Sequence, residues 1–241
     1  MKDYKKKKRK YRGLKLLLIL IVLLIIQSFL CRVKIIEVNG TERYNSEELR
    51  KYIITNKFKN NSWLLYMENK MKSNYNIPYI KSIDLRLSSF NKIQLNVEEK
   101  TIPYQIEFDN KIYDISEDFK IEGISTKQNT NSIILKGYDI ESLSIGEDVN
   151  FISENDKNII KYVYYNLSSA KINDFNELLL KDNIILSSKK MKVEFGTGED
   201  IEKKIKVLVN SYPKIKNLSG TLYLNEFKND DSGYQFKKIS E

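Results

Sequence analysis

The longest apolar stretch of the chain runs from Leu14 to Cys31, and Lys15 is the only charged residue within it. As a helix, these 18 residues are roughly 27 Å long at about 1.5 Å per residue. That length is close to the ~30 Å hydrocarbon core of a bilayer. No later segment has a comparable run. The pattern predicts one transmembrane helix over 14–31, which separates a tail of residues 1–13 from the large remainder of the chain.

Residues 32–100 alternate between the strand and helix periods and predict the order strand, helix, helix, strand, strand. Asn39-Gly40 is a turn signal that ends the first strand. The expected elements are a strand over 33–38, a helix capped by Asn45 and Glu48 with Leu49, Tyr52 and Ile53 on its apolar stripe, a helix capped by Ser62 with Leu64, Met67 and Met71 on its stripe, and strands over 83–87 and 93–97.

Residues 101–228 read as a second domain, made of many short strands and two helices. Strands are expected over 106–108, 111–115, 133–135, 175–180, 184–187, 191–195 and 220–227. The helices are expected to follow the caps Ser153 and Thr197, each with an aspartate three residues later, and Pro213 to end the second helix. Residues 229–241 form a polar tail.

The segment from Pro78 to Pro103, PYIKSIDLRLSSFNKIQLNVEEKTIP, resembles the FtsQ/DivIB cell-division family. The matching positions are Pro78, Ile80, Leu85, Arg86, Phe90, Val97, Glu99 and Pro103. The sequence departs from the family pattern at Phe90, where a Trp is usual, and at Asn91, which replaces a Pro but is itself a good turn residue. The block MKVEFGTGEDIEKKIKVLV, followed by Gly220 and a strand, resembles the carboxy-terminal β-domain of the same family.

Pattern and resemblance together predict an α+β fold. It comprises a single N-terminal transmembrane helix, a small POTRA domain (β-α-α-β-β) over 32–100, and a β-rich domain over 101–228. The β-rich domain is expected to have a mostly antiparallel sheet with flanking helices.

Charge predicts the orientation in the membrane. Residues 1–15 hold nine basic residues against Asp3 alone, while the whole chain is only +9. The positive-inside rule places the basic tail in the cytoplasm, against anionic lipid headgroups, and the large part outside. A nucleic-acid-binding tail is the weaker interpretation of the same charges, and no nucleic-acid partner is expected.

A cleaved signal peptide is the main alternative for the apolar segment. No small-x-small site follows it, and Leu30 before Cys31 is not small, so an uncleaved anchor is expected. Cys31 is the only cysteine, so no disulfide can form within the chain. It is either an acylation site at the membrane edge or, as we expect, a small apolar residue.

The sequence lacks the residues that most enzyme sites need. It has no histidine and one cysteine, which excludes histidine-based triads, histidine-ligated metals and zinc-thiolate clusters. Gly196-Thr197-Gly198 does not continue as a phosphate-binding loop. Glu98 and Glu99 are adjacent on a strand and point to opposite faces, so they cannot converge. We expect no enzyme activity, no metal and no cofactor.

Function is therefore sought on surfaces, and the last strand is the first candidate. Thr221 to Asn225 carries neither charge nor proline, which is unusual for a sheet edge and suits strand addition by a partner. A paired core strand is the equal alternative. The resemblance implies that bitopic partners like FtsB/DivIC and FtsL dock on Tyr212, Gly220, Thr221, Leu222, Tyr223, Leu224, Asn225, Glu226 and Phe227. Strands 33–38 and 83–87 are candidate surfaces of the first domain.

The resemblance implies a non-enzymatic bitopic scaffold at the division septum, which recruits and regulates septal wall synthesis through contacts outside the cytoplasm. Two alternatives are kept. One is a POTRA-type chaperone or secretion factor that binds extended polypeptides, and the other is a membrane-tethered enzyme.

Overall fold

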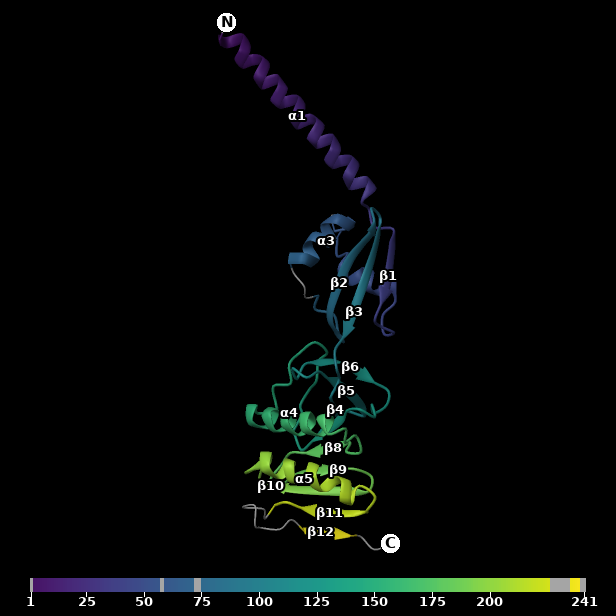
Figure 1. Ribbon diagram of the computed structural model, residues 1–241, viewed down its shortest axis with the longest axis vertical. Helices are drawn as coiled ribbons and strands as arrows, with labels where there is room; N and C mark the ends of the chain where they lie inside the picture. Colours follow the sequence, from purple (N-terminus) through teal and green to yellow (C-terminus); the bar gives the residue numbers. More distant parts are fainter. Residues whose placement is uncertain (1, 57–58, 72–74, 226–234, 239–241) are drawn as a thin grey trace. The chain divides into compact units, whose positions relative to one another are not determined.

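The computed structural model describes residues 2–56, 59–71, 75–225 and 235–238; for residues 2–13 it describes the backbone alone. The chain divides into two compact units, residues 1–99 and 100–241. Each combines helices with one β-sheet, so the predicted α+β class is confirmed (Figure 1).

The first helix, α1 (Lys2–Leu30), covers the predicted membrane segment. Its large apolar side chains from Leu14 to Leu30 are exposed, between 43% at Ile21 and 76% at Phe29. Among the residues whose side chains the structure describes, no helix has both the length and the hydrophobicity that crossing a membrane takes.

The rest of the first unit has the predicted β-α-α-β-β order. Its elements are β1 (Ile35–Asn39), α2 (Ser46–Ile53), α3 (Ser62–Met71), β2 (Ile80–Ser89) and β3 (Lys92–Glu99). The sheet order is β1-β3-β2, with β1 parallel and β2 antiparallel to the central β3. Fully buried Leu85, Ile93 and Leu95 form the middle of the core with Leu49 and Leu65 from the two helices.

Helix α2 starts at the predicted capping box. The Asn45 side chain accepts a hydrogen bond from the Glu48 amide (3.0 Å), and the Glu48 carboxylate accepts one from the Asn45 amide (2.9 Å). Leu49 and Ile53 are buried as predicted. Tyr52 is 43% exposed and packs edge-on against Tyr44, so its place on the buried stripe was wrong.

Helix α3 buries a different face from the predicted one. Leu64, Met67 and Met71 are 49%, 40% and 77% exposed, and the buried positions are Ser62, Leu65 and Asn69. Both sets have the same spacing, so periodicity alone could not choose between them. The cap is also shifted: the Asn61 side chain, not that of Ser62, accepts hydrogen bonds from the Trp63 and Leu64 amides (3.1 Å each).

Asn69 lies on the buried face of α3 and covers part of the β2 edge of the sheet. Its amide nitrogen donates to the Ile83 carbonyl (2.8 Å), and its oxygen accepts from the Leu85 amide (3.0 Å). Strand β2 is an end strand, and these groups lie on the side without a neighbouring strand. One side chain therefore satisfies two backbone groups of an edge that would otherwise offer them to another strand.

The second unit contains a nine-stranded sheet in the order β12-β11-β10-β9-β8-β7-β4-β5-β6. Its elements are β4 (Tyr104–Phe108), β5 (Lys111–Ile115), β6 (Ile121–Ser125), β7 (Ile133–Lys136), α4 (Glu154–Ser169), β8 (Glu177–Leu179), β9 (Ile184–Ser187), β10 (Met191–Gly196), α5 (Ile201–Ile215), β11 (Gly220–Tyr223) and β12 (Gln235–Lys238). Five of the eight pairings are antiparallel, as predicted for most of the sheet.

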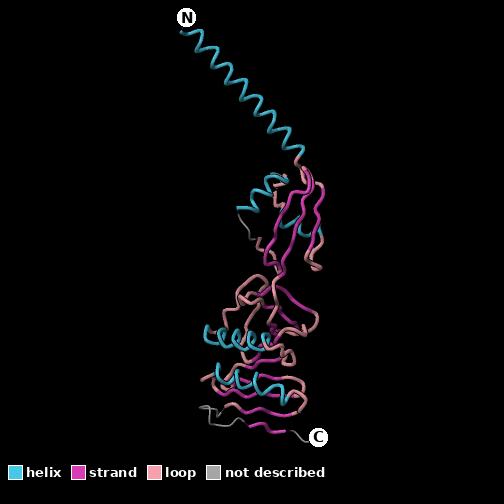
Figure 2. Tube along the Cα trace, viewed as in Figure 1, coloured by secondary structure: helices cyan, strands magenta, loops and turns pink. Residues whose placement is uncertain are grey.

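Helices α4 and α5 lie side by side on one face of this sheet (Figure 2). The Ser153 cap of α4 is confirmed, because its side chain accepts a hydrogen bond from the Asp156 amide (3.1 Å). Helix α5 differs from prediction at both ends. It is preceded by Asp200 in a left-handed conformation (φ 53°) instead of being capped by Thr197, and it continues through Pro213 to Ile215.

Candidate protein-binding surface

Strand β11 has a neighbour on each side. It runs parallel to β10, with Val193 opposite Leu222, and antiparallel to β12, with Leu222 opposite Phe236. The alternative of a paired strand is thus the one that the structure shows, and the exposed-edge prediction was wrong. Strand β12 lies in the stretch predicted as a polar tail, whose few apolar residues, Phe236 and Ile239 among them, gave no strand pattern.

Gly220 permits this pairing at the start of β11. A Cβ atom at Gly220 would lie 2.4 Å from the Lys237 carbonyl oxygen and 2.9 Å from the Phe236 ring. Backbone cannot yield to such a contact as a flexible side chain can. Glycine is therefore needed here for the close approach of β12.

The two faces of β11 have different environments, as the alternation predicts. Leu222 and Leu224 are fully buried beneath the helices. Thr221 and Tyr223 point the other way and are half-buried, and Asn225 is exposed. The predicted site residues Glu226 and Phe227 lie outside the described residues.

The face that carries Thr221 and Tyr223 lies opposite the helices. Register places Tyr223 between Glu194 of β10 and Gln235 of β12, and Thr221 between Lys192 and Lys237. Lys192 and Glu194 form an ion pair along β10 (3.2 Å). The face therefore offers one aromatic ring in a polar and charged setting, a composition common at protein interfaces.

The two edges of the sheet differ in how they are covered. At the β6 edge, the Ile121 amide donates to the Glu147 carbonyl (2.9 Å), and the Gly146 amide donates to the Ile121 carbonyl (2.7 Å). The other edge is β12, beyond which the described part of the chain places no strand. Among the described residues, β12 is thus the edge of this sheet at which no further strand or loop is seen to pair.

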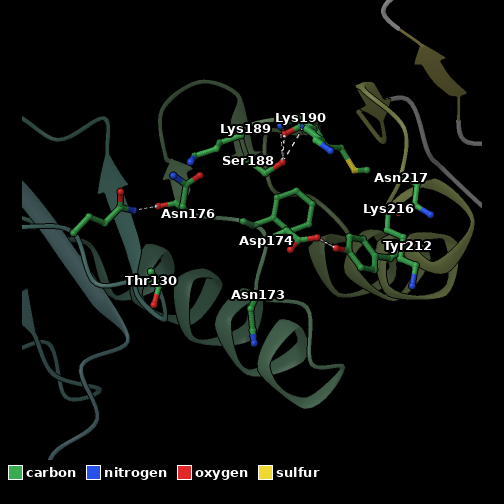
Figure 3. Close-up of a pocket in the computed structure, with 13 residues that line it drawn as sticks. Thr130, Asn173, Asp174, Asn176, Ser188, Lys189, Lys190, Tyr212, Lys216 and Asn217 are labelled. Carbon is green, nitrogen blue, oxygen red and sulfur yellow. Dashed lines mark hydrogen bonds between the residues drawn. The ribbon is translucent and has the colours of Figure 1, made fainter.

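Tyr212, the remaining predicted residue, lies on α5 in the wall of a cavity of about 570 Å³ (Figure 3). Its hydroxyl donates a short hydrogen bond to the Asp174 carboxylate, and its ring packs against Phe175 with 6.1 Å between centroids. Burial, and then the hydrogen bond to Asp174, raise the pKa of Tyr212 above its ordinary value of 10.0. The ring is therefore held in place as a neutral hydrogen-bonded group.

Three lysines, Lys189, Lys190 and Lys216, stand around the same cavity (Figure 3). Their side chains are exposed, and none forms an ion pair with another residue in the described part of the chain. The sequence alone does not single out these three lysines, because lysines are frequent throughout the chain. The Lys190 carbonyl accepts a hydrogen bond from the Gly220 amide (3.0 Å), which joins the cavity to the start of β11.

Within the part of the chain that the structure describes, the lining of the cavity contains few groups suited to acid–base chemistry. Asp174 is the only acidic one of these lining residues, and it accepts the hydrogen bond from Tyr212. Among the described residues, no group of three histidine, cysteine or acidic side chains is placed to bind a metal ion. A cationic rim suits an acidic segment of another protein.

The FtsQ-type POTRA domain family matches residues 31–100, which confirms the POTRA prediction for the first unit. A curated relative, "Cell division protein DivIB" of Clostridium tetani (strain Massachusetts / E88), is 26% identical over 179 residues. This alignment covers 72% of the chain and 66% of the relative, just under two thirds of its length.

Among solved structures, the major extracytoplasmic domain of the cell-division protein DivIB from Geobacillus stearothermophilus (trans isomer) is similar at 11% identity. The match covers 51% of the chain and 99% of that domain, with a TM-score of 0.31. Agreement of this size is too loose to equate individual residues of the two proteins.

Proposed function

We propose that the chain is a member of the FtsQ/DivIB cell-division family, a proposal supported by the FtsQ-type POTRA match and the alignment with a DivIB protein. The protein acts as a non-enzymatic, membrane-anchored scaffold of the bacterial division machinery. It recruits and regulates septal wall synthesis by binding other bitopic proteins outside the cytoplasm. The observation that carries this role is the FtsQ-type POTRA match over residues 31–100, next to an alignment with a DivIB protein that extends well beyond it.

The anchor in this proposal is α1. Two observations support it: the segment is helical from Lys2 to Leu30, and its apolar side chains from Leu14 onward are exposed to the surroundings instead of packed in a core. The excess of basic residues before Leu16 favours a cytoplasmic N-terminus. Both domains then lie on the outer side of the membrane, at the septum of dividing cells.

The partner surface in this proposal extends from the lysine-rimmed cavity at Tyr212 along β11 to the β12 edge. Of the predicted residues that the structure describes, Tyr212, Thr221, Tyr223 and Asn225 are accessible and make up this surface. Leu222 and Leu224 are fully buried, so we no longer assign them a contact with the partner. An FtsB/DivIC-like or FtsL-like partner binds with an acidic segment near Lys189, Lys190 and Lys216, and with an extended segment along the sheet. Tyr223 supports this assignment as a half-buried aromatic ring on the face away from the helices.

The test is a full-length fluorescent fusion in dividing cells, with pull-down of its membrane neighbours. We expect a mid-cell band and recovery of the two partner types. Tyr223→Lys should abolish recovery while the circular dichroism spectrum stays unchanged. Tyr165→Lys is the matched control, because Tyr165 is 72% exposed on α4, away from the proposed surface. Loss of recovery with both variants, or with neither, contradicts the surface; an even envelope signal without these partners contradicts the division role.

A POTRA-type chaperone or secretion factor is the alternative. It would bind unrelated extended polypeptides with similar affinity, whereas the scaffold binds a few fixed partners. Titration with unfolded, unrelated polypeptides distinguishes the two roles.

A further inference from the structure

Three large apolar side chains are exposed around one end of the POTRA domain. Phe90, at the tip of the β2–β3 hairpin, is 75% exposed, and Trp63 and Leu64, in the first turn of α3, are 47% and 49% exposed. Trp63 is the only tryptophan of the chain. Single apolar residues on a surface need no explanation, but a group that contains the sole tryptophan does.

Hydrogen bonds hold this group next to the point where α1 joins the domain. The Cys31 carbonyl accepts from the Ser62 amide (2.7 Å), and the Ser62 hydroxyl donates to the Phe90 carbonyl. The Asn91 carbonyl accepts from the Lys34 amide (2.8 Å). The start of α3, the hairpin tip and residues 31–34 are thus one rigid corner of the domain.

No linker separates this corner from α1. The helix ends at Leu30, and the next residue, Cys31, is only 6% exposed and already belongs to the domain. Burial also argues against acylation of Cys31, the alternative considered from the sequence. Wherever the end of α1 lies, Trp63 and Phe90 must lie within a few residue lengths of it.

The same corner is basic. Arg32 and Lys34 are exposed, and neither forms an ion pair with a side chain in the described part of the chain. Lys92, by contrast, is paired with Glu37 (2.6 Å). Tryptophan and phenylalanine beside unpaired basic residues are the combination that membrane–water interfaces favour, since the rings enter the boundary region and the cations meet phosphates.

We propose that this corner, made of Arg32, Lys34, Trp63, Leu64 and Phe90, inserts into the headgroup region of the phospholipid bilayer and fixes the POTRA domain on the membrane surface. The inference rests on the proposed role of α1 as the anchor. A lipid surface is chosen over a protein partner because the corner adjoins the anchor without a linker and its charge complements lipid phosphate.

The test uses the full chain reconstituted into vesicles of phosphatidylethanolamine and phosphatidylglycerol. Trp63 is the sole tryptophan, so its fluorescence reports the corner alone. The control is the double variant Trp63→Phe with Lys81→Trp, which moves the tryptophan to an exposed site at the other end of β2. Position 90 is nine residue steps along the chain from position 81, a distance of about 30 Å and more than the depth of the headgroup layer.

We expect lipids brominated near the top of their acyl chains to quench Trp63 at least twofold more than the control tryptophan. Acrylamide in the water should quench Trp63 at least twofold less. Equal quenching at the two sites, with the chain floating with the vesicles, overturns the corner's insertion but leaves the anchor intact. Failure to float with the vesicles overturns the anchor itself. Protection of Trp63 that grows with protein density in the vesicle shows a protein neighbour, and it also overturns the lipid assignment.

Discussion

Replacement of Asn69 by alanine tests whether one side chain closes the edge of the POTRA sheet. The substitution removes both hydrogen bonds to β2 and leaves the Ile83 carbonyl and the Leu85 amide without a partner. These two residues are 3% and 0% exposed. An unsatisfied buried backbone group costs about 1–3 kcal/mol. Because water can reach an end strand in part, we expect a total loss of about 2–4 kcal/mol, roughly a hundredfold in the folding equilibrium constant.

The assay is urea unfolding of the full chain in detergent, followed by the fluorescence of Trp63. This residue lies on the same helix as Asn69 and reports the first unit alone. The midpoint should fall by at least about 1 M urea for Asn69→Ala. It should not move for Met71→Ala, whose side chain is 77% exposed on the same helix.

Hydrogen exchange supplies a second, local readout for the same variant. The Leu85 amide should exchange faster in Asn69→Ala, while amides of β2 that face β3 change only with global stability. An unchanged midpoint, or a Leu85 amide as protected as before, would refute the closure of this edge by Asn69.

Three further predictions concern the second unit. Gly220→Ala should release β12, seen as faster hydrogen exchange of its amides with those of β9 unchanged, because the added Cβ would meet β12 backbone at 2.4 Å. Burial lowers the pKa of Lys204, whose ammonium donates to the Phe195 carbonyl (2.7 Å), so the folded state binds less proton than the unfolded one. The free energy of unfolding should therefore rise as the pH rises from this lowered pKa to the ordinary value of 10.5. In Lys204→Met this rise should be absent, as urea unfolding at several pH values would show. Lys100→Met should cost about 3 kcal/mol by thermal unfolding, because the 2.6 Å ion pair with Glu122 is lost while that carboxylate, 2% exposed, stays buried; an unchanged midpoint would show that its other contacts suffice.

Sequence patterns predicted the structure correctly where the local signal and the tertiary fold favour the same conformation. The Asn45 capping box and the alternation of β2 and β3 were both predicted, since each follows from backbone geometry a few residues long. Leu222 and Leu224 were predicted as partner-binding residues, and their full burial shows that this assignment was wrong. The resemblance of residues 78–103 to the FtsQ/DivIB family added the identification of a POTRA domain, which the family match over residues 31–100 confirms.

The predictions that were wrong or incomplete share one cause. The local sequence allowed more than one arrangement, and contacts with distant parts of the chain decided which one forms. Helix α3 has two stripes with identical spacing, and the one with Asn69 is buried because a polar side chain there satisfies the β2 edge. Strand β12 has almost no apolar pattern and is placed by pairing with β11. Lys189 and Lys190 lie in the turn between β9 and β10, and Lys216 follows α5. Only the fold brings these lysines together around Tyr212.

The order of strands in the second unit bears on the order in which this domain can fold. From β7 onward, each new strand is added beside the one before it, so β8, β9, β10, β11 and β12 extend the sheet in a single direction. Each late strand can therefore pair with a strand that precedes it in the sequence, so the sheet can grow during synthesis without waiting for later residues. Among the described residues, the end strand of this series is β12. A strand that a partner donates at the β12 edge would extend the sheet by one more strand in the same direction.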